Sequence, residues 1–263
     1  MSQVLLEAKG VTLQYKTPRH LVTATYKVDF SVHQGDRYVI LGPSGCGKST
    51  LLKAVGGFML PVEGTIRIRG RKVEIPGPDR MMVFQEFEQL MPWKTVFQNV
   101  IFPMKVTKKF PFPEAIARAN AVIEKVGLTE FRDVYPHMLS GGMKMRVAIA
   151  RAMALEPDIL LMDEPFAALD ALTRRAMQQE LLSLWDQLRF TVMFVTHSIE
   201  EAILIGSRIL VLSPHPGRVR AELDTSRINV IDQAEFGAMS KRIHRLLFAE
   251  GDARAAAVES VPA

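Results

Sequence analysis

Residues 39–50 read Val-Ile-Leu-Gly-Pro-Ser-Gly-Cys-Gly-Lys-Ser-Thr, which places the motif Gly-x-x-x-x-Gly-Lys-Ser between an apolar strand and a helical pattern. Glycines allow backbone N–H groups to curl around phosphates, and the helix N-terminus adds positive partial charge. Lys48 is expected to reach the outer phosphates of a nucleotide, and the Ser49 hydroxyl to ligate Mg²⁺. A glycine-rich turn that binds nothing is the weaker alternative, because strand, loop and helix occur in the required order. The residues predicted to contact the nucleotide are Gly42, Pro43, Ser44, Gly45, Cys46, Gly47, Lys48, Ser49 and Thr50.

The whole chain has the size and composition of a globular protein with one large domain or two small ones. It contains 263 residues, of which 48% are hydrophobic and 23% charged, and these values exclude disordered, collagenous and disulfide-framework proteins. A single cysteine, Cys46, excludes an internal disulfide and agrees with a reducing compartment. Its variable position in the motif favours a tolerated small side chain over a redox role.

Charge and hydropathy restrict the partners of the chain. The 33 Lys and Arg against 28 Asp and Glu give a net charge of +5, and the basic residues are scattered, so we do not expect nucleic acid as a partner. Anionic lipid and a partner protein both stay open from charge alone. No apolar run approaches the roughly 18 residues that span a bilayer, and the first residues lack a secretion signal. We therefore expect a protein that neither spans a membrane nor is secreted.

Strands and helices alternate along most of the chain, except in the middle. After residues 81–84 a stretch with several prolines interrupts the alternation, and from about Gly251 an alanine-rich segment without periodicity predicts a frayed tail. β-Branched, aromatic and apolar runs predict strands at Val11–Tyr15, Tyr26–Val32, Tyr38–Leu41, Thr65–Arg69, Ile159–Met162 and Thr191–Val195. Helical spacing predicts helices after Gly47 as far as Val55, and at Pro113–Val126, Gly141–Leu155 and Leu172–Leu188.

Two acids end the apolar run Ile-Leu-Leu-Met-Asp-Glu at residues 159–164. Adjacent carboxylates on a strand point to opposite faces, so they can serve different roles where the strand ends. Asp163 is expected to hold the Mg²⁺ shell, and Glu164 to polarise an attacking water. The alternative is an acidic strand end before Pro165 that has no catalytic role. The phosphate-binding motif at Lys48 in the same chain makes this alternative less favoured.

The segment Leu-Ser-Gly-Gly-Met at residues 139–143 opens one of the predicted helices. Ser140 suits an N-cap, and the two glycines leave N–H groups accessible to an anion. With the following Lys-Met-Arg-Val-Ala-Ile-Ala-Arg-Ala, the segment resembles the signature motif of ATP-binding cassette (ABC) ATPases, and the resemblance covers nearly the whole chain. It implies that Ser140, Gly141 and Gly142 bind ATP.

Four further segments are similar to motifs of this family, and they follow one another along the chain in the order that the family shows. Gln85, in Met-Met-Val-Phe-Gln, resembles the Q-loop glutamine that links Mg²⁺ and water to a helical subdomain. His197 matches the switch histidine, which contacts the γ-phosphate and positions Glu164. Ala168-Leu169-Asp170 resembles the D-loop that contacts the opposite subunit. Tyr15 stands where the family places an aromatic ring under adenine, although an exposed strand tyrosine is an alternative.

Besides Ala167, where many members of the family have serine, two positions depart from the pattern of the family. Met145 stands where a glutamine is frequent, and Ser198 stands where an acid often follows the histidine. Neither departure removes a group that hydrolysis needs, so we expect an ATPase. The resemblance implies Glu164, His197 and Gln85 as catalytic residues, and Ser49, Gln85 and Asp163 as Mg²⁺ ligands.

The resemblance also implies a fold. It is an α/β fold, a P-loop NTPase cassette with a mostly parallel sheet, an N-terminal antiparallel β subdomain and an inserted helical subdomain at about residues 86–139. The ATPase domain would span residues 1–250, with a disordered tail at 251–263. In this family two cassettes face head to tail, and each ATP lies between one phosphate loop and the signature helix of the other subunit. ATP closes the dimer and hydrolysis reopens it.

Residues 83–96, 161–174 and 213–219 look most like the importers of nitrate, sulfonate and taurine. Without a membrane-spanning segment, uptake of a small solute requires separate permease subunits, and an extracytoplasmic solute-binding protein acts indirectly. The expected location is the cytoplasmic face of the inner membrane, as a peripheral subunit. Two alternatives stay open: an ABC ATPase of DNA repair or ribosomes, and a P-loop kinase or GTPase.

Overall fold

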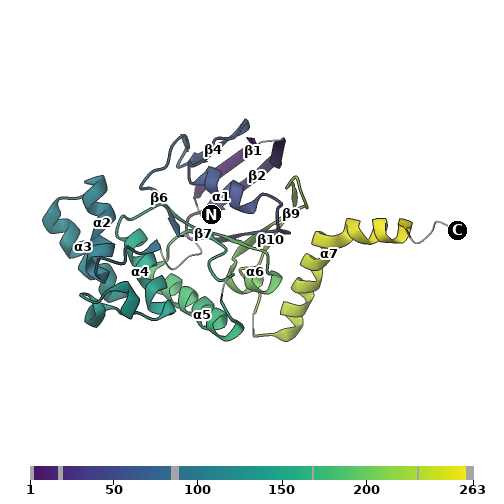
Figure 1. The fold of residues 1–263 in the computed structure, drawn as a ribbon. Helices are drawn as coiled ribbons and strands as arrows, with labels where there is room; N and C mark the ends of the chain where they lie inside the picture. Colours follow the sequence, from purple (N-terminus) through teal and green to yellow (C-terminus); the bar gives the residue numbers. More distant parts are fainter. Residues whose placement is uncertain (1–2, 17–19, 84–88, 168, 230, 259–263) are drawn as a thin grey trace. The chain divides into compact units, whose positions relative to one another are not determined.

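The computed structural model describes residues 3–16, 20–83, 89–167, 169–229 and 231–258, and Figure 1 shows its ribbon. The chain divides into two compact units. Unit 1 comprises residues Met1–Val55, Met59–Val73 and Phe194–Ala263, and unit 2 comprises residues Gly56–Phe58 and Glu74–Met193. The described strands form one antiparallel and one mostly parallel sheet, as the sequence predicted.

Unit 1 contains the antiparallel sheet, in the order β2-β1-β4-β5, and strands β10, β9 and β3 of the mostly parallel sheet. Strand β8 (Val192–Thr196) is divided between the units, its last three residues belonging to unit 1. The other elements of unit 1 are β1 (Val4–Lys16), β2 (Leu21–His33), β3 (Arg37–Leu41), α1 (Lys48–Val55), β4 (Glu63–Ile68), β5 (Arg71–Lys72), α6 (Ile199–Ile205), β9 (Arg208–Leu212), β10 (Val219–Asp224) and α7 (Gln233–Val258).

Strands β1 and β2 form a long antiparallel pair with an irregular register. Ala8 pairs with Phe30, and the register shifts between Ala8 and Val11. The shift falls at Gly10, which has a φ of 58°, a conformation that glycine adopts without steric cost. The Gly10 N–H donates to the Asp29 carboxylate at 2.8 Å. The side chain of Asp29 therefore provides an acceptor for the Gly10 N–H where the register shifts.

Strand β3 leads directly into the phosphate-binding loop. Residues 38–41 are fully buried, as expected for a parallel strand covered on both faces. Val39 pairs with Ile209 of β9 in parallel, and β10 pairs with β9 in antiparallel orientation. Helix α1 begins at Lys48, directly after the loop. The loop therefore lies at the carboxyl end of a parallel strand, where ligands of α/β sheets bind.

Unit 2 contains the second half of the mostly parallel sheet and most of the helices. Met81 pairs with Leu160 in parallel. In Figure 1, α2 lies beside α3 and α4, and all three are in contact. The elements are β6 (Arg80–Val83), α2 (Val96–Thr107), α3 (Phe112–Lys125), the 3-10 helices η2 (Thr129–Phe131) and η3 (Pro136–Met138), α4 (Gly141–Met153), β7 (Ile159–Asp163) and α5 (Ala171–Leu188).

Helix α2 is an element that the sequence pattern did not predict. The Thr95 hydroxyl accepts from the Gln98 N–H at 3.3 Å, and the Gln98 side chain accepts from the Thr95 N–H at 3.1 Å. Fully buried Asn99 donates to the carbonyl oxygens of Met91 and Lys94. Thr-x-x-Gln is a capping box, so the start of α2 was readable from the sequence. Pro103 inside the helix obscured the rest.

The end of the chain also differs from the expectation. Helix α7 continues to Val258, across residues 251–258 that we predicted to be frayed. Alanine has the highest helix propensity, which favours a helix there in the absence of a periodic apolar face. Residues 259–263 lie outside the described part. The boundaries of the ATPase domain at residue 250 and of the helical subdomain at about 86–139 stay predictions. Among the helices that the structure describes, none combines the length and apolar character needed to cross a bilayer.

Candidate nucleotide-binding site

The phosphate-binding loop, residues 42–49, belongs to unit 1 and joins β3 to α1. Gly45 and Gly47 have φ values of 79° and 97°, which L-residues with side chains rarely adopt. The Cys46 N–H donates to the Pro43 carbonyl at 3.3 Å, so the loop curls back on itself. The glycines predicted to curve the backbone are therefore at the positions where the curvature occurs.

Lys48 lies inside this curve. Its side-chain ammonium donates to the carbonyl oxygens of Gly42 at 2.9 Å and Pro43 at 3.1 Å. The residue is only 4% exposed. The Lys48 ammonium places a positive charge within the loop, which favours an anion nearby.

The loop packs directly on β2. A Cβ atom at Gly47 would lie 2.6 Å from the Ala24 carbonyl oxygen and 2.8 Å from the Thr25 Cγ2 atom. Real Cβ atoms do not approach other atoms this closely, so any side chain at Gly47 would displace the loop. The second fixed glycine of the motif is thus required both for its φ angle and for this contact.

Asp163 and Glu164 belong to unit 2, at the end of β7. The four preceding residues of β7 are fully buried, and both acids are partly exposed. Glu164 has a φ of 43°, unusual for a residue with a side chain, and its carbonyl oxygen accepts from the Ala167 N–H at 3.1 Å. Non-glycine residues in this region concentrate at functional sites, where strain serves the site. Five other described non-glycine residues also have a positive φ, so the catalytic role of Glu164 stays a prediction that rests on its place after β7.

The predicted signature segment also belongs to unit 2. Ser140 is the N-cap of α4, and its hydroxyl accepts from the Met143 N–H at 3.3 Å. Apart from its chain neighbours and the backbone of its own helix, no atom of the described residues lies within 4 Å of a Cβ atom built at Gly141. A Cβ atom at Gly142 would lie 2.8 Å from the Glu180 carboxylate on α5. Gly141 therefore leaves space beside the helix start, whereas Gly142 allows α5 to approach.

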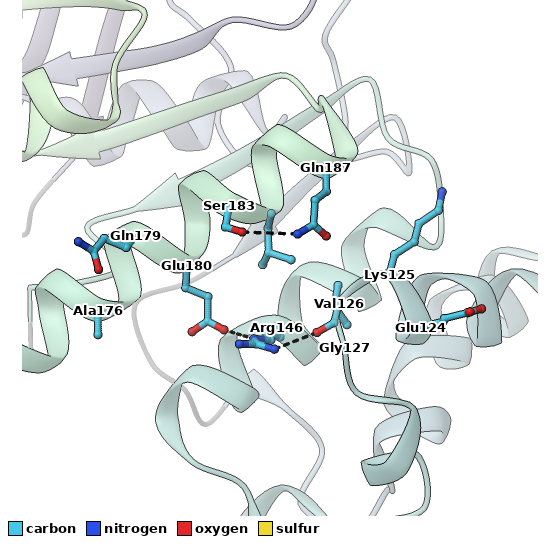
Figure 2. A pocket seen from close by; sticks show the side chains of 11 residues that line it. Glu124, Lys125, Val126, Gly127, Arg146, Ala176, Gln179, Glu180, Ser183 and Gln187 are labelled. Atoms are coloured by element: carbon cyan, nitrogen blue, oxygen red, sulfur yellow. Dashed lines mark hydrogen bonds and ion pairs between the residues drawn. The ribbon is translucent and has the colours of Figure 1, made fainter. Parts of the chain in front are cut away.

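Glu180 was not predicted from the sequence, and it forms an ion pair with Arg146 of α4. Figure 2 shows Arg146 of α4 between two acceptors, the Glu180 carboxylate and the Val126 carbonyl oxygen at 3.3 Å. These residues line a polar pocket of about 540 Å³ in unit 2. The helical pattern of residues 172–188 predicted the helix, but nothing in that pattern indicated which residue of the helix would contact α4.

The other predicted residues are placed as follows. His197 is exposed and follows β8, and Ser198 caps α6 by accepting from the Glu201 N–H at 3.3 Å. Ser198, which departs from the family pattern, therefore has a structural role as a helix cap. The sequence could have indicated this role, because serine is a preferred N-cap residue. Tyr15 lies in β1 and is 42% exposed. Gln85 lies outside the described residues.

Asp170 of the predicted D-loop is the N-cap of α5. Its carboxylate accepts from the backbone N–H groups of Leu172 at 3.1 Å and Thr173 at 3.0 Å. Hydrogen bonding by the Thr173 side chain, and then by its backbone, lowers the pKa of Asp170 below the usual range. The Leu169 carbonyl accepts from Arg174 at 2.8 Å.

Ala168 lies outside the described residues. Met145, the other position that departs from the family pattern, is buried in the core of unit 2.

The residues available for Mg²⁺ fit its preferences. The Ser49 hydroxyl and the Asp163 carboxylate are oxygen donors, which Mg²⁺ prefers, and Mg²⁺ in nucleotide sites takes few ligands from the protein. In the described part of the chain, no group of three or more His, Cys, Asp or Glu could hold a metal ion.

Comparison with known proteins agrees with these features. Residues 26–167 match the family model described as "ABC transporter". The chain is 45% identical over 249 residues to a taurine import ATP-binding protein of Rhizobium johnstonii, covering 90% of this chain and 93% of that protein. It is 42% identical over 212 residues to a nitrate import ATP-binding protein of Synechococcus elongatus, covering 80% and 76%. A dimeric ATP-binding cassette in a post-hydrolysis state with ADP and Pi matches with a TM-score of 0.66 and 32% identity, covering 84% and 98%.

Proposed function

Because this chain belongs to the ABC transporter family, we propose that it is the ATP-hydrolysing subunit of an importer that takes up a small solute through separate permease subunits. The complete loop at residues 42–49, with Lys48 folded inside it, is the observation that carries the proposal. Relatives named for the import of taurine, nitrate and bicarbonate support a small solute of that kind.

Each predicted residue has a role in the proposed hydrolysis. The loop N–H groups and Lys48 bind the β- and γ-phosphates, and the Tyr15 ring supports adenine. Ser49, Asp163 and Gln85 would hold Mg²⁺, which would neutralise phosphate charge. Glu164 accepts a proton from the water that attacks the γ-phosphorus, and the bond to the ADP oxygen breaks. His197 contacts the γ-phosphate and positions Glu164.

We propose that two copies of the chain assemble head to tail around ATP. The dimeric state of the similar cassette supports this assembly. The open space beside Gly141 supports an approach by nucleotide from outside the subunit, because no described atom of this chain would block it. The exposed Ser140 and the half-buried first turn of α4 would then complete the site of the second copy.

The permease is proposed to dock on α2. Trp93, Phe97 and Phe102 line a small apolar pocket of about 290 Å³, with Lys94 and Lys105 beside it. Trp93 is 70% exposed, and large exposed aromatic residues are frequent anchors of interfaces. The sequence from residue 93 to 112 contains four lysines and no acid. A partner segment with an apolar anchor and nearby carboxylates would complement this surface.

Docking on α2 can be tested in membranes that contain the permease. Trp93→Ala should reduce the amount of the chain that sediments with these membranes, because the aromatic anchor is removed. Ile231→Ala, which removes another exposed apolar side chain, is the matched control and should leave sedimentation unchanged. Equal retention of both variants would contradict docking at this pocket.

The proposed location is the cytoplasmic face of the inner membrane, with attachment through the permease rather than through lipid. Deletion of the permease should therefore release the chain into the supernatant after ultracentrifugation. Membrane binding that persists without the permease would reveal a lipid-binding surface instead.

The transport role is tested by reconstitution of the chain with its permease in liposomes. ATP supplied on the side of the membrane that carries the chain should drive solute uptake into the opposite compartment. Addition of a solute-binding protein should stimulate ATP hydrolysis. An ATPase of DNA repair or ribosomes is the rival. Purification of the chain with ribosomes or DNA-repair proteins, and without any membrane subunit, would favour the rival and contradict import.

A further inference from the structure

The turn that joins β9 to β10, residues 213–218, lies against the phosphate-binding loop of the same unit. A Cβ atom at Gly217 would lie only 2.2 Å from the Cys46 carbonyl oxygen. At the other end of the loop, a Cβ atom at Gly42 would lie 3.3 Å from the Leu212 carbonyl oxygen. The loop thus touches the chain both immediately before the turn and near the end of the turn.

Gly217 is held in place by β2. Its N–H donates to the Ala24 carbonyl oxygen at 2.9 Å, and its own carbonyl oxygen accepts from the Tyr26 N–H at 2.9 Å. The same Ala24 carbonyl oxygen lies against Gly47 of the loop. Three backbone segments therefore meet at Ala24, and none of them can shift without moving another.

The turn has its own internal hydrogen bonds. The Ser213 hydroxyl accepts from the Arg218 N–H at 3.0 Å, and its single proton lies within reach of the carbonyl oxygens of Pro214 at 2.9 Å and Pro216 at 3.1 Å. The Ser213 N–H donates to the Arg218 carbonyl oxygen at 2.9 Å, and the Arg218 guanidinium lies 4.5 Å from the centre of the Tyr26 ring. These contacts hold the turn against β2 and leave little freedom at Gly217.

We infer that the turn at residues 213–218 braces the phosphate-binding loop, and that Gly217 is a positioning residue for nucleotide affinity. The inference rests on the proposed role of this loop in ATP binding. The loop binds phosphate through backbone N–H groups, and its glycines give it conformational freedom in the absence of contacts. A rigid neighbour reduces the entropy that is lost when the N–H groups align on phosphate, and so raises affinity.

Gly217→Ala tests the brace directly. The φ of Gly217 lies outside the positive region, so alanine can adopt the backbone conformation and the added methyl group acts through its contact with Cys46. We expect the Kd for a non-hydrolysable ATP analogue to rise about tenfold in calorimetry, as the loop is displaced. Gly237→Ala is the matched control, because a Cβ atom there meets no atom of the described residues within 4 Å outside its own helix, and it should bind like the parent chain.

A second variant separates bracing from a general loss of stability. Ser213→Ala adds no atom and removes only the internal bonds of the turn, so it should raise the Kd about threefold while the melting temperature without nucleotide changes little. Amide hydrogen exchange in residues 43–48 should become faster in this variant, because the loop is held less firmly. Exchange far from the loop should stay the same.

The outcomes distinguish the two proposals. If the parent chain binds no ATP, the proposed function fails. If the parent chain binds ATP and both variants bind it equally well, or if they lose melting temperature with an unchanged Kd, the brace is refuted. If Gly217→Ala does not fold, Ser213→Ala decides through its Kd and its exchange rates.

Discussion

The Lys48 ammonium group donates a hydrogen bond of 2.9 Å to the carbonyl oxygen of Gly42, the first residue of the phosphate-binding loop. The side chain therefore crosses the curve of the loop and lies where phosphate is proposed to bind. Exchange of a neutral carbonyl for a phosphate oxygen would convert this bond into one between opposite charges, which is stronger. The loop thus holds its cation ready for an anionic ligand.

Lys48→Ala should abolish ATP binding, because the loop loses the cation that faces the outer phosphates. Calorimetry with ATP measures the effect. Lys53→Ala is the control, since Lys53 belongs to the same helix and is exposed. Unchanged affinity in Lys48→Ala would count against the nucleotide site.

Glu164→Gln should keep ATP binding and stop turnover, because the amide preserves the shape of the side chain and cannot accept the proton of water. Size-exclusion chromatography with ATP should show a trapped dimer. Glu200→Gln, a change at an exposed acid of α6, should hydrolyse ATP normally. Full ATPase activity in Glu164→Gln would assign the base to another residue, with His197 the first candidate.

Ser140→Arg tests whether the sites are shared between subunits. The bulky cation should block closure over the ATP of the other chain and leave binding to its own loop intact. Homodimers of Ser140→Arg and of Lys48→Ala should both be inactive. Equal random mixing makes about half of the dimers mixed, each with one whole site, so independent sites should recover roughly a quarter of the parent ATPase rate.

Differential tags should confirm that mixed dimers form in that experiment. A site contained within one chain would recover nothing on mixing. The absence of rescue in confirmed mixed dimers would therefore reject shared, independently working sites.

Glu180→Gln should loosen the contact between α4 and α5, because Arg146 loses its charged partner. Both side chains are partly exposed, so solvent screening limits the expected loss to about 1 kcal/mol, or roughly 2–4 °C in melting temperature. Glu124→Gln changes an exposed acid of the same pocket and should melt like the parent. Identical melting of the two variants would show that the ion pair adds no stability.

The cap at Asp170 should make stability depend on pH. Because the folded-state pKa of Asp170 is lowered, its contribution is full above the unfolded pKa of about 3.9 and is lost as the pH falls through the folded pKa. Asp170→Asn keeps an acceptor without this titration, so its melting temperature should fall less between pH 5 and pH 3. Circular dichroism melts measure the slope, and a curve parallel to that of the parent would contradict the assignment.

Local features of the site were predictable because their signals are close together in the chain. Strand β3, the loop and helix α1 follow one another, and the glycines, lysine and serine of the motif stand at fixed spacing. The apolar run of β7 ends at Asp163, as the pattern indicated, and Ser140 caps α4. Helix α2 was missed because Pro103 concealed a pattern whose capping box was present at its start.

The sequence by itself determined which residues curve the loop and carry the charges of the site, because backbone freedom, capping and ionisation are properties of individual residues and their near neighbours. Only the tertiary structure decided that Glu180 lies against Gly142 and that Gly217 lies against Cys46. These contacts join segments far apart in the chain, and their closeness depends on how whole strands and helices pack. At these two contacts the packing is so dense that only glycine fits, and the local sequence pattern does not reveal which distant segment lies there.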